Sequence, residues 1–307
     1  MAHEILAATN AVVTLDVALP GIVWPWFVTM NMWAKSIGTG VIFMLFYLLK
    51  KYTDDKEVGG LRLPVAFLSV AFITIFLLFT LADLHQPFRM WHIFFYPHFT
   101  SAITVGAIMA SVFMGLISVL FLLSCERLDF IMKNNDELYD KILTWTTALA
   151  VPVTLYTAAL LSECTARELW QMPTESAQMI LAATLSGSAT ILLVGYKLSY
   201  EAKRDMGIIL AFSAFSAFTL YMSELVFGPM KAEEVQATIA FITHGGEWQT
   251  AFWVGQSFAY IIPFVLVLLS LKSKSESIMK LAAISALAGL FVVKHVWLVI
   301  PQLLSMS

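Results

Sequence analysis

Long apolar runs separated by short polar segments dominate this chain of 307 residues. A transmembrane helix needs about 20 consecutive, mostly apolar residues, and runs of this length recur along nearly the whole sequence. We therefore predict an all-α integral membrane protein with eight transmembrane helices in a bundle. The predicted helices span residues 22–49, 61–82, 102–123, 142–162, 176–196, 206–227, 247–271 and 278–300.

The predicted helices form a single membrane domain that covers residues 1–307. Residues 1–21 are a mildly apolar, non-cytoplasmic preamble, residues 22–300 hold the bundle, and residues 301–307 are a short tail. The N-terminus has no basic segment ahead of an apolar core, so we expect no removable signal peptide.

Composition excludes a soluble domain and several redox cofactors. Hydrophobic residues make up 59% and charged residues 13% of the chain, whereas charged residues are about 25% of an ordinary soluble domain. The two cysteines, Cys125 and Cys164, are far apart and lack a CxxC pattern, so this chain alone holds no iron–sulfur cluster. His295 is the one histidine inside a predicted helix, so a bis-histidine haem is excluded as well.

Lysine and arginine are distributed unequally between alternate connections. Thirteen of them lie at the connections that follow the first, third, fifth and seventh predicted helices. Three of them, Arg89, Arg167 and Lys231, lie at the connections on the other side. Cytoplasmic loops carry the excess of lysine and arginine in membrane proteins. We therefore predict that both termini and residues 83–101 are non-cytoplasmic.

Among the charged residues within predicted helices or at their ends, four are candidates for a functional role. Lys35 is about 20 Å below the start of the first helix at 1.5 Å per residue, and Lys294 is in the outer half of the last helix. Asp83 and Glu224 stand at the outer ends of the second and sixth helices. A charge within the membrane is costly and indicates a functional site. Lys294 is also close enough to its helix end to pair with a carboxylate or to reach the surface.

The connection between the second and third predicted helices is both polar and aromatic. It contains Asp-Leu-His-Gln-Pro at residues 83–87 and, after an aromatic stretch, Thr-Ser-Ala at residues 100–102. This arrangement resembles the NrfD-like family, the multi-spanning membrane subunits of polysulfide reductase and related complexes. The family has Asp-Leu-Gly-Arg-Pro and Thr-Ser-Pro at these places, and the chain departs from them at His85, Gln86 and Ala102.

Further family-like motifs follow in the same order over most of the chain. They are Trp24-Pro25-Trp26, Gly38-Thr39-Gly40, Tyr-Thr-Ala-Ala-Leu-Leu-Ser at 156–162, Trp170, Pro173, Gly289, Lys294 and Gln302. Asn31 stands where the family's first helix commonly has a histidine that faces a quinone. The resemblance implies a quinone-interacting anchor subunit of the bacterial or archaeal cytoplasmic membrane, working in anaerobic respiration.

The resemblance also implies two partners, an iron–sulfur subunit on the non-cytoplasmic face and a molybdopterin catalytic subunit joined to it. The aromatic connection, through Arg89, Trp91 and His92, is then the docking surface. Arg167 and Trp170, in a later connection on the same side, would add to it. The histidines of the aromatic connection lack regular helical spacing, and we predict no metal site.

A quinone head group needs hydrogen-bond partners at two carbonyls, a proton route and an apolar slot. Asn31, Lys35 and Tyr156 are the candidate donors. Asp83 would exchange protons with the outer surface, and Trp26 would flank the ring. The quinone is expected to be of the menaquinone type. The terminal substrate and the direction of electron flow depend on the partners, since no complete active site lies on this chain.

Two other classes of protein fit parts of the pattern. A transporter also has buried charges along its substrate path, but it should show polar residues that reach both faces. A purely structural anchor for a redox partner accounts for the aromatic connection and leaves Lys35 without a role.

The inner halves of the helices offer only hydroxyls, such as those of Thr144, Thr146, Thr147 and Ser213. We therefore predict that the chain is not by itself a proton pump.

Overall fold

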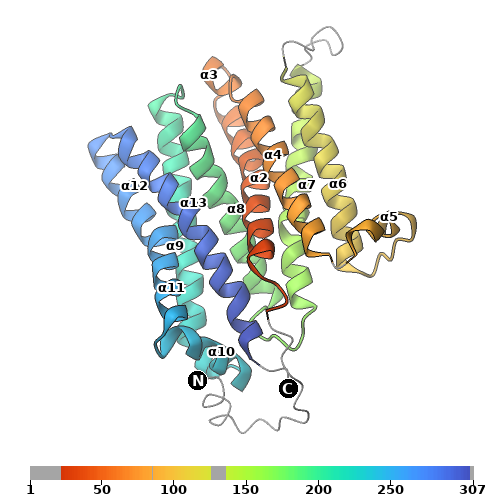
Figure 1. Cartoon of the computed structure of the whole chain (residues 1–307). Coiled ribbons are helices and arrows are strands. Elements are labelled where there is room, and N and C mark those ends of the chain that lie inside the picture. The colour runs from red at the N-terminus through yellow and green to blue at the C-terminus, as the bar shows by residue number, and fades with distance from the viewer. Residues whose placement is uncertain (1–21, 85, 126–135, 305–307) are drawn as a thin grey trace.

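The computed structural model describes residues 22–84, 86–125 and 136–304. Within these ranges, eight helices are long and apolar enough to cross a membrane, which confirms the predicted number. The described residues contain no strand, and the long helices run roughly parallel to one axis (Figure 1). The predicted N-terminal preamble, His85 and the last three residues of the tail lie outside the described residues.

The membrane spans are α2 (Trp26–Lys51), α4 (Arg62–Asp83), α6 (Ala102–Leu123), α7 (Asp136–Ser162), α8 (Met172–Val194), α9 (Tyr200–Phe227), α11 (Glu247–Gln256) continued by η4 (Ser257–Ile261) and α12 (Ile262–Ser273), and α13 (Glu276–Val299). Short elements join them, namely α3 (Lys56–Gly59), η1 (Pro87–Arg89), α5 (His92–Phe95), η3 (Gly228–Met230), α10 (Glu233–Thr243) and η5 (Ile300–Leu303).

The predicted starts of three helices were several residues too late. The fourth span begins at Asp136 rather than at 142, the fifth at Met172 rather than at 176, and the sixth at Tyr200 rather than at 206. The Ser199 hydroxyl caps the sixth span by accepting a hydrogen bond from the backbone N–H of Ala202 at 3.3 Å. The apolar run marks only the part of a helix that lies in hydrocarbon, and a polar N-terminal turn extends past it because its groups remain in water.

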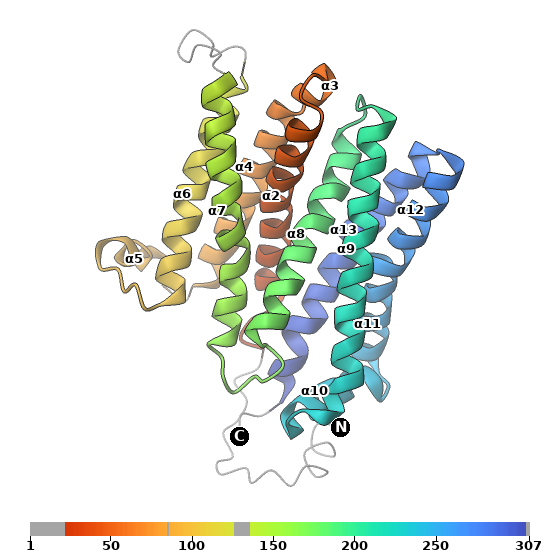
Figure 2. The ribbon, with the colours of Figure 1, turned by 180° about the vertical axis from the view of Figure 1, so that it is seen from behind.

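The bundle has two halves, with α2 at their junction (Figures 1 and 2). One half contains α2, α4, α6 and α7, and the other contains α8, α9, α11 to α12, and α13. Glycines let α2 pack closely on α8, since a Cβ on Gly40 would lie 2.0 Å from the Ala183 carbonyl oxygen and one on Gly187 would lie 2.2 Å from the Gly40 oxygen. Such contacts between small residues are typical of membrane helices.

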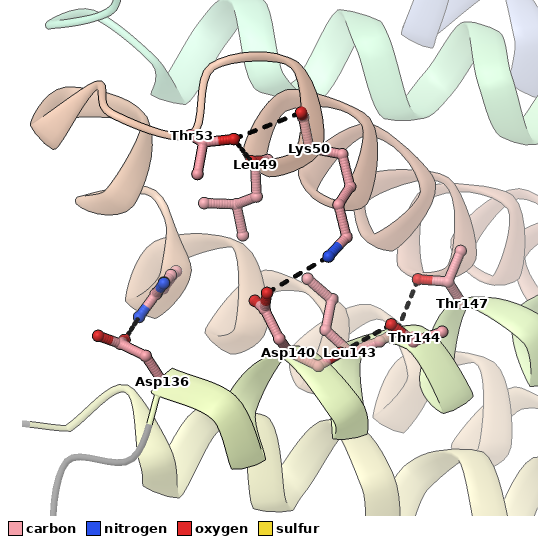
Figure 3. A network of polar contacts seen from close by, with 9 residues as sticks. Leu49, Lys50, Thr53, Asp136, Asp140, Leu143, Thr144 and Thr147 are labelled. Carbon is pink, nitrogen blue, oxygen red and sulfur yellow. Dashed lines mark hydrogen bonds and ion pairs between the residues drawn. The ribbon is translucent and has the colours of Figure 1, made fainter.

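Charged residues gather at the end of the bundle where α2 ends and α13 begins, which we call the basic end. There Lys50 pairs with Asp140 at 3.3 Å (Figure 3), and Arg62 pairs with Asp136 at 2.6 Å. These ion pairs join α2 and α4 to α7 and are partly exposed, so each adds about 0 to 1 kcal/mol. They mark where the spans leave the apolar region.

The opposite end, where α2 begins and α13 ends, is called the site end. The helix α10 lies across it under the second half of the bundle, whereas η1 and α5 project sideways next to α6 (Figures 1 and 2). At the site end, the second half of the bundle is therefore covered by α10, whereas the first half is flanked by η1 and α5.

The seventh span contains a turn of π-helix, η4, at Pro263. In this turn the N–H of Ile262 bonds the Ser257 carbonyl, and Pro263 has no N–H to offer to the next carbonyl, that of Phe258. The Ser285 hydroxyl of α13 donates to the Phe258 oxygen instead, at 2.7 Å. Gly289 allows this approach, because a Cβ there would lie 2.0 Å from the backbone nitrogen of Ala259.

Candidate functional site

A cavity of about 410 Å³ lies in the first half of the bundle, between α2, α4, α6 and α7. Its wall is mostly apolar, with side chains such as Leu77, Leu81 and Met114. Met90 and Phe94, from the η1–α5 segment, line it at its site end. A cavity of this volume and composition is typical of a small-molecule site.

Three of the predicted quinone ligands line this cavity, namely Asn31, Asp83 and Tyr156. The Asn31 amide donates to the Phe76 carbonyl at 3.2 Å and to the Thr80 hydroxyl, which ties it to α4. Asp83 is the last residue of α4, so its carboxyl stands at the site end of the cavity. The structure therefore brings together an amide, a phenol and a carboxyl that are far apart in the sequence.

Lys35 lies directly behind this wall and is fully buried. Its ammonium group donates to the Thr154 carbonyl at 3.1 Å and to the Thr157 hydroxyl, and it lies 4.6 Å from the centre of the Tyr156 ring. Thr157 and Tyr156 line the cavity, while Lys35 does not. Lys35 thus acts on the cavity through these two residues, by hydrogen bonding and by a cation–π contact.

The Tyr156 ring is held in place by a glycine of α6. A Cβ on Gly106 would lie 2.5 Å from Cδ2 of Tyr156, so a larger residue would push the ring. On another side the ring meets Phe76 edge to face, with 6.2 Å between centroids. These contacts fix the phenol at the cavity wall.

Trp26, the predicted aromatic flank, lies outside the cavity. It is 48% exposed and packs on Phe27 and Phe79. Trp24, two residues earlier, lines the cavity and stacks on Trp170 with centroids 5.4 Å apart. Gly38 and Gly40 face neighbouring helices, since a Cβ on Gly38 would meet α4 and one on Gly40 would meet α8.

The predicted docking residues fall into two groups. Arg89, Trp91 and His92 are exposed on the η1–α5 segment. Arg167 and Trp170 are buried, with 9% and 4% exposure. The Arg167 guanidinium donates to the Leu304 carbonyl at 3.0 Å and lies 3.8 Å from the Glu234 carboxylate, so it fastens the α7–α8 connection to α10 and to the C-terminal segment. Burial raises the pKa of the Glu234 carboxyl, and the Arg167 charge opposes this rise.

The family assignment follows from a comparison with known proteins. The model of the family described as "Polysulphide reductase, NrfD" matches residues 17–304, which is nearly the whole chain. The chain belongs to the NrfD family. No curated protein was found to match the chain.

Membership indicates the general role of the chain. NrfD proteins are membrane subunits of polysulphide reductase-like complexes. They are quinone-associated in general and typically assemble with iron–sulfur and molybdopterin subunits. The predicted family and the predicted all-helical membrane fold are both confirmed.

The remaining buried charges of this NrfD-family chain lie in the second half of the bundle. The Glu224 carboxylate pairs with Lys231 at 2.6 Å and accepts from the Thr174 hydroxyl at 3.2 Å. Lys294 faces α8, where its ammonium lies 3.5 Å from the sulfur of Met179. Near it is Glu175, which is 1% exposed and was not among the residues selected from the sequence. Glu175 was missed because it lies in the polar first turn of α8, whereas the predicted helix began one residue after it, at residue 176.

Two hydroxyls of α7 toward the basic end bond to their own helix, whereas the Ser213 hydroxyl lies 2.8 Å from that of Thr184 on α8. Thr144 donates to the Asp140 carbonyl at 2.7 Å and Thr147 to the Leu143 carbonyl at 2.8 Å (Figure 3).

Within the described ranges, no group of three or more histidine, cysteine, aspartate or glutamate side chains is placed to hold a metal ion.

Proposed function

We propose that the chain is the quinone-binding membrane subunit of a polysulphide reductase-like complex, and that the cavity between α2, α4, α6 and α7 is its quinone site. The observation that carries the proposal is the cavity of about 410 Å³, which combines a long apolar wall with Asn31, Tyr156 and Asp83. Ligand pockets of about 300 to 1,000 Å³ usually have this combination. A flat ring fits the aromatic and aliphatic wall, and its two carbonyls need only a few donors.

Each polar residue has a distinct role in this proposal. The Tyr156 phenol donates a hydrogen bond to a ring carbonyl. The two N–H groups of Asn31 are bonded to α4, so its side-chain oxygen is the group that faces the ligand and accepts from a quinol hydroxyl. Lys35 fixes Thr157 and favours negative charge at the ring by its own charge. A quinone that accepts two electrons takes up two protons, and a quinol that is oxidised releases them. Asp83, at the mouth of the cavity, passes these protons between the ring and water at the site end.

The proton route runs to the site end and not through the bundle. The Thr144 and Thr147 hydroxyls are tied to backbone carbonyls of α7 and offer no continuous path to the basic end. By the excess of basic residues, the basic end is cytoplasmic and the site end is non-cytoplasmic. In this proposal the chain exchanges quinone protons with the outer side of a bacterial or archaeal cytoplasmic membrane.

The η1–α5 segment is the proposed dock for the iron–sulfur subunit, which in turn binds the molybdopterin subunit. Arg89, Trp91 and His92 present charge and aromatic surface, and Phe88 is 93% exposed. Aromatic residues and arginine are enriched at protein interfaces. Phe94 of the same segment lines the cavity, so a partner docked here lies next to the ring and the electron path stays short.

Isolation of the native complex tests this proposal. After gentle extraction, mass spectrometry of the bound lipids should find a quinone, of the menaquinone type, in about equal amount to the chain. The partner subunits should appear in the same preparation. An Asn31→Leu variant should lose the quinone, whereas Thr219→Val, which removes a hydroxyl bonded only to the α9 backbone at 2.9 Å, should keep it. A fully assembled complex that retains no quinone would contradict the proposal.

A further inference from the structure

A second, smaller polar pocket lies in the other half of the bundle. Its volume is about 10 Å³, and side chains of α8, α9, η4 and α13 enclose it. Met32 and Leu161 line both this pocket and the large cavity, so these two apolar side chains form the partition between them. A space of about 10 to 15 Å³ holds one water molecule if two to four polar groups surround it.

The polar groups around this pocket are incompletely paired. The Glu175 carboxylate accepts from the Trp297 indole N–H at 2.9 Å, and the Lys294 ammonium lies 3.5 Å from the Met179 sulfur, which is a weak acceptor. The buried Gln178 side-chain N–H₂ group has no hydrogen-bond partner among the described residues. Buried donors without partners are uncommon in folded proteins and point to an ordered water.

One helix end favours a negative charge at this pocket. Glu175 is in the first turn of α8, where the positive end of the helix dipole stabilises a carboxylate. Lys294 comes from α13, more than one turn before that helix ends at Val299. A carboxyl and an amino group from two different helices therefore line a space of about one water molecule.

We propose that this pocket is a proton-exchange site in which one water bridges Glu175, Gln178 and Lys294. The water accepts hydrogen bonds from the ammonium and the amide and donates one to the carboxylate. A proton then moves from Lys294 through the water to Glu175, which converts the ion pair into a neutral amine and a neutral carboxylic acid. The return transfer restores the pair, and no electron or net charge is moved.

The surroundings contain few groups that compete for this proton. Tyr221 of α9 and Tyr260 of η4 line the pocket and stack with 5.8 Å between centroids. Glu224, on α9, is already paired with Lys231 at 2.6 Å. Lys35 on α2 is on the other side of the partition, and the His295 ring turns away to Thr29 with its Nδ1 3.0 Å from the hydroxyl. The site therefore stands on its own and does not depend on the large cavity being a quinone site.

Infrared spectroscopy of the purified complex tests the exchange. In Lys294→Met the Glu175 carboxylate loses its counter-charge and should become protonated, which produces a carboxylic acid C=O band that moves in D₂O. The band should be absent from the Glu175→Gln/Lys294→Met double variant. Lys203→Met is the matched control, because Lys203 is a buried lysine with a direct partner, Glu276 at 2.8 Å, at the basic end. No new band in Lys294→Met, or the same band in the control, overturns the proposal.

Thermal stability gives a second test that does not depend on spectral assignment. Glu175→Gln and Lys294→Met each remove one partner, so the remaining buried group must either stay charged without a counter-charge or be neutralised. Both variants should therefore melt at a lower temperature than the parent. The double variant should recover most of the loss. Additive losses in the double variant would contradict a coupled pair. Cryo-electron microscopy at a resolution that shows waters elsewhere in the bundle should show density between Gln178 and Lys294. Absence of this density would contradict the bridging water.

Discussion

The ammonium group of Lys35 lies 4.6 Å from the centre of the Tyr156 ring, across the wall of the large cavity. A buried amino group thus touches the face of the ring whose phenol belongs to the cavity. The contact makes the two residues one unit, so a change in either should alter the cavity in a related way.

We predict that Tyr156→Phe and Lys35→Met both lower the affinity for quinone. Removal of one hydrogen bond costs about 0.5 to 1.5 kcal/mol, so Tyr156→Phe should weaken binding by up to about tenfold. Lys35→Met should have at least as large an effect, since it removes a charge and frees Thr157. Titration of the complex with a quinone-site inhibitor, followed by turnover, measures both. If inhibition and turnover stay unchanged in both variants, the shared site is wrong.

A glycine substitution should act on the cavity without removing any polar group. Gly106→Ala places a Cβ 2.5 Å from the Tyr156 ring, and overpacking of this kind costs about 1 to 3 kcal/mol. We expect a displaced ring and quinone affinity reduced by about tenfold or more. Gly115→Ala, on the same helix with nothing within 4 Å of its added Cβ, is the matched control. Equal affinity in the two variants would show that the ring position does not matter.

The proposed dock should release its partner when its charged and aromatic side chains are removed. In Arg89→Ala/Trp91→Ala we expect the iron–sulfur subunit to be lost during purification while the chain remains inserted, because both side chains are exposed on the η1–α5 segment. Trp145→Ala is a suitable control, since Trp145 is a 71% exposed aromatic residue on the side of α7. Pull-down with quantification of each subunit measures the loss. An intact complex in the double variant contradicts the assignment.

Close packing of α2 on α8 should make Gly40 intolerant of any side chain. An alanine there meets the Ala183 carbonyl oxygen at 2.0 Å, and backbone atoms at a helix contact have little freedom to move. We expect Gly40→Ala to lower the melting temperature strongly or to prevent accumulation, while Gly59→Ala, which meets nothing within 4 Å, leaves both unchanged. Fluorescence-detected size exclusion after heating measures this directly. Normal stability of Gly40→Ala would mean that the two helices are less tightly joined.

The orientation of the chain remains a prediction from its basic residues. A phosphatase fused after Ser307 should be active outside the cytoplasm, and a fusion in the α8–α9 connection, next to Lys197, should be inactive. The opposite pair of activities would invert the proposed proton route, because the site end would then face the cytoplasm.

The sequence predicted the helices more completely than the site. Eight apolar runs are a local signal, and Ala102–Leu123 was predicted with its observed bounds. Lys35, Asn31 and Tyr156 were found because polar residues are rare in such runs. Trp26 was selected rather than Trp24, which lines the cavity, because the sequence does not show which of two tryptophans separated by one residue faces inward.

Residues whose role depends on distant contacts could not be read from the sequence. Arg167 and Trp170 look like exposed loop residues, but contacts with Leu304 and Trp297, more than 100 residues away, bury them. Glu175 sits in a polar helix start, where acidic residues are common for reasons of capping and dipole. Only the fold shows that this start is covered by α13 and that Lys294 faces it.

The π-helical turn at Pro263 has a mechanical consequence for the second half of the bundle. The Phe258 carbonyl relies on Ser285 of the following span for its hydrogen bond, and an unpaired carbonyl in hydrocarbon is unfavourable by several kcal/mol. Gly289 holds the same two spans in backbone contact. The seventh and eighth spans are therefore joined by a hydrogen bond and by backbone contact at the level of the π-helical turn, so we expect a displacement of α13 to carry the seventh span with it.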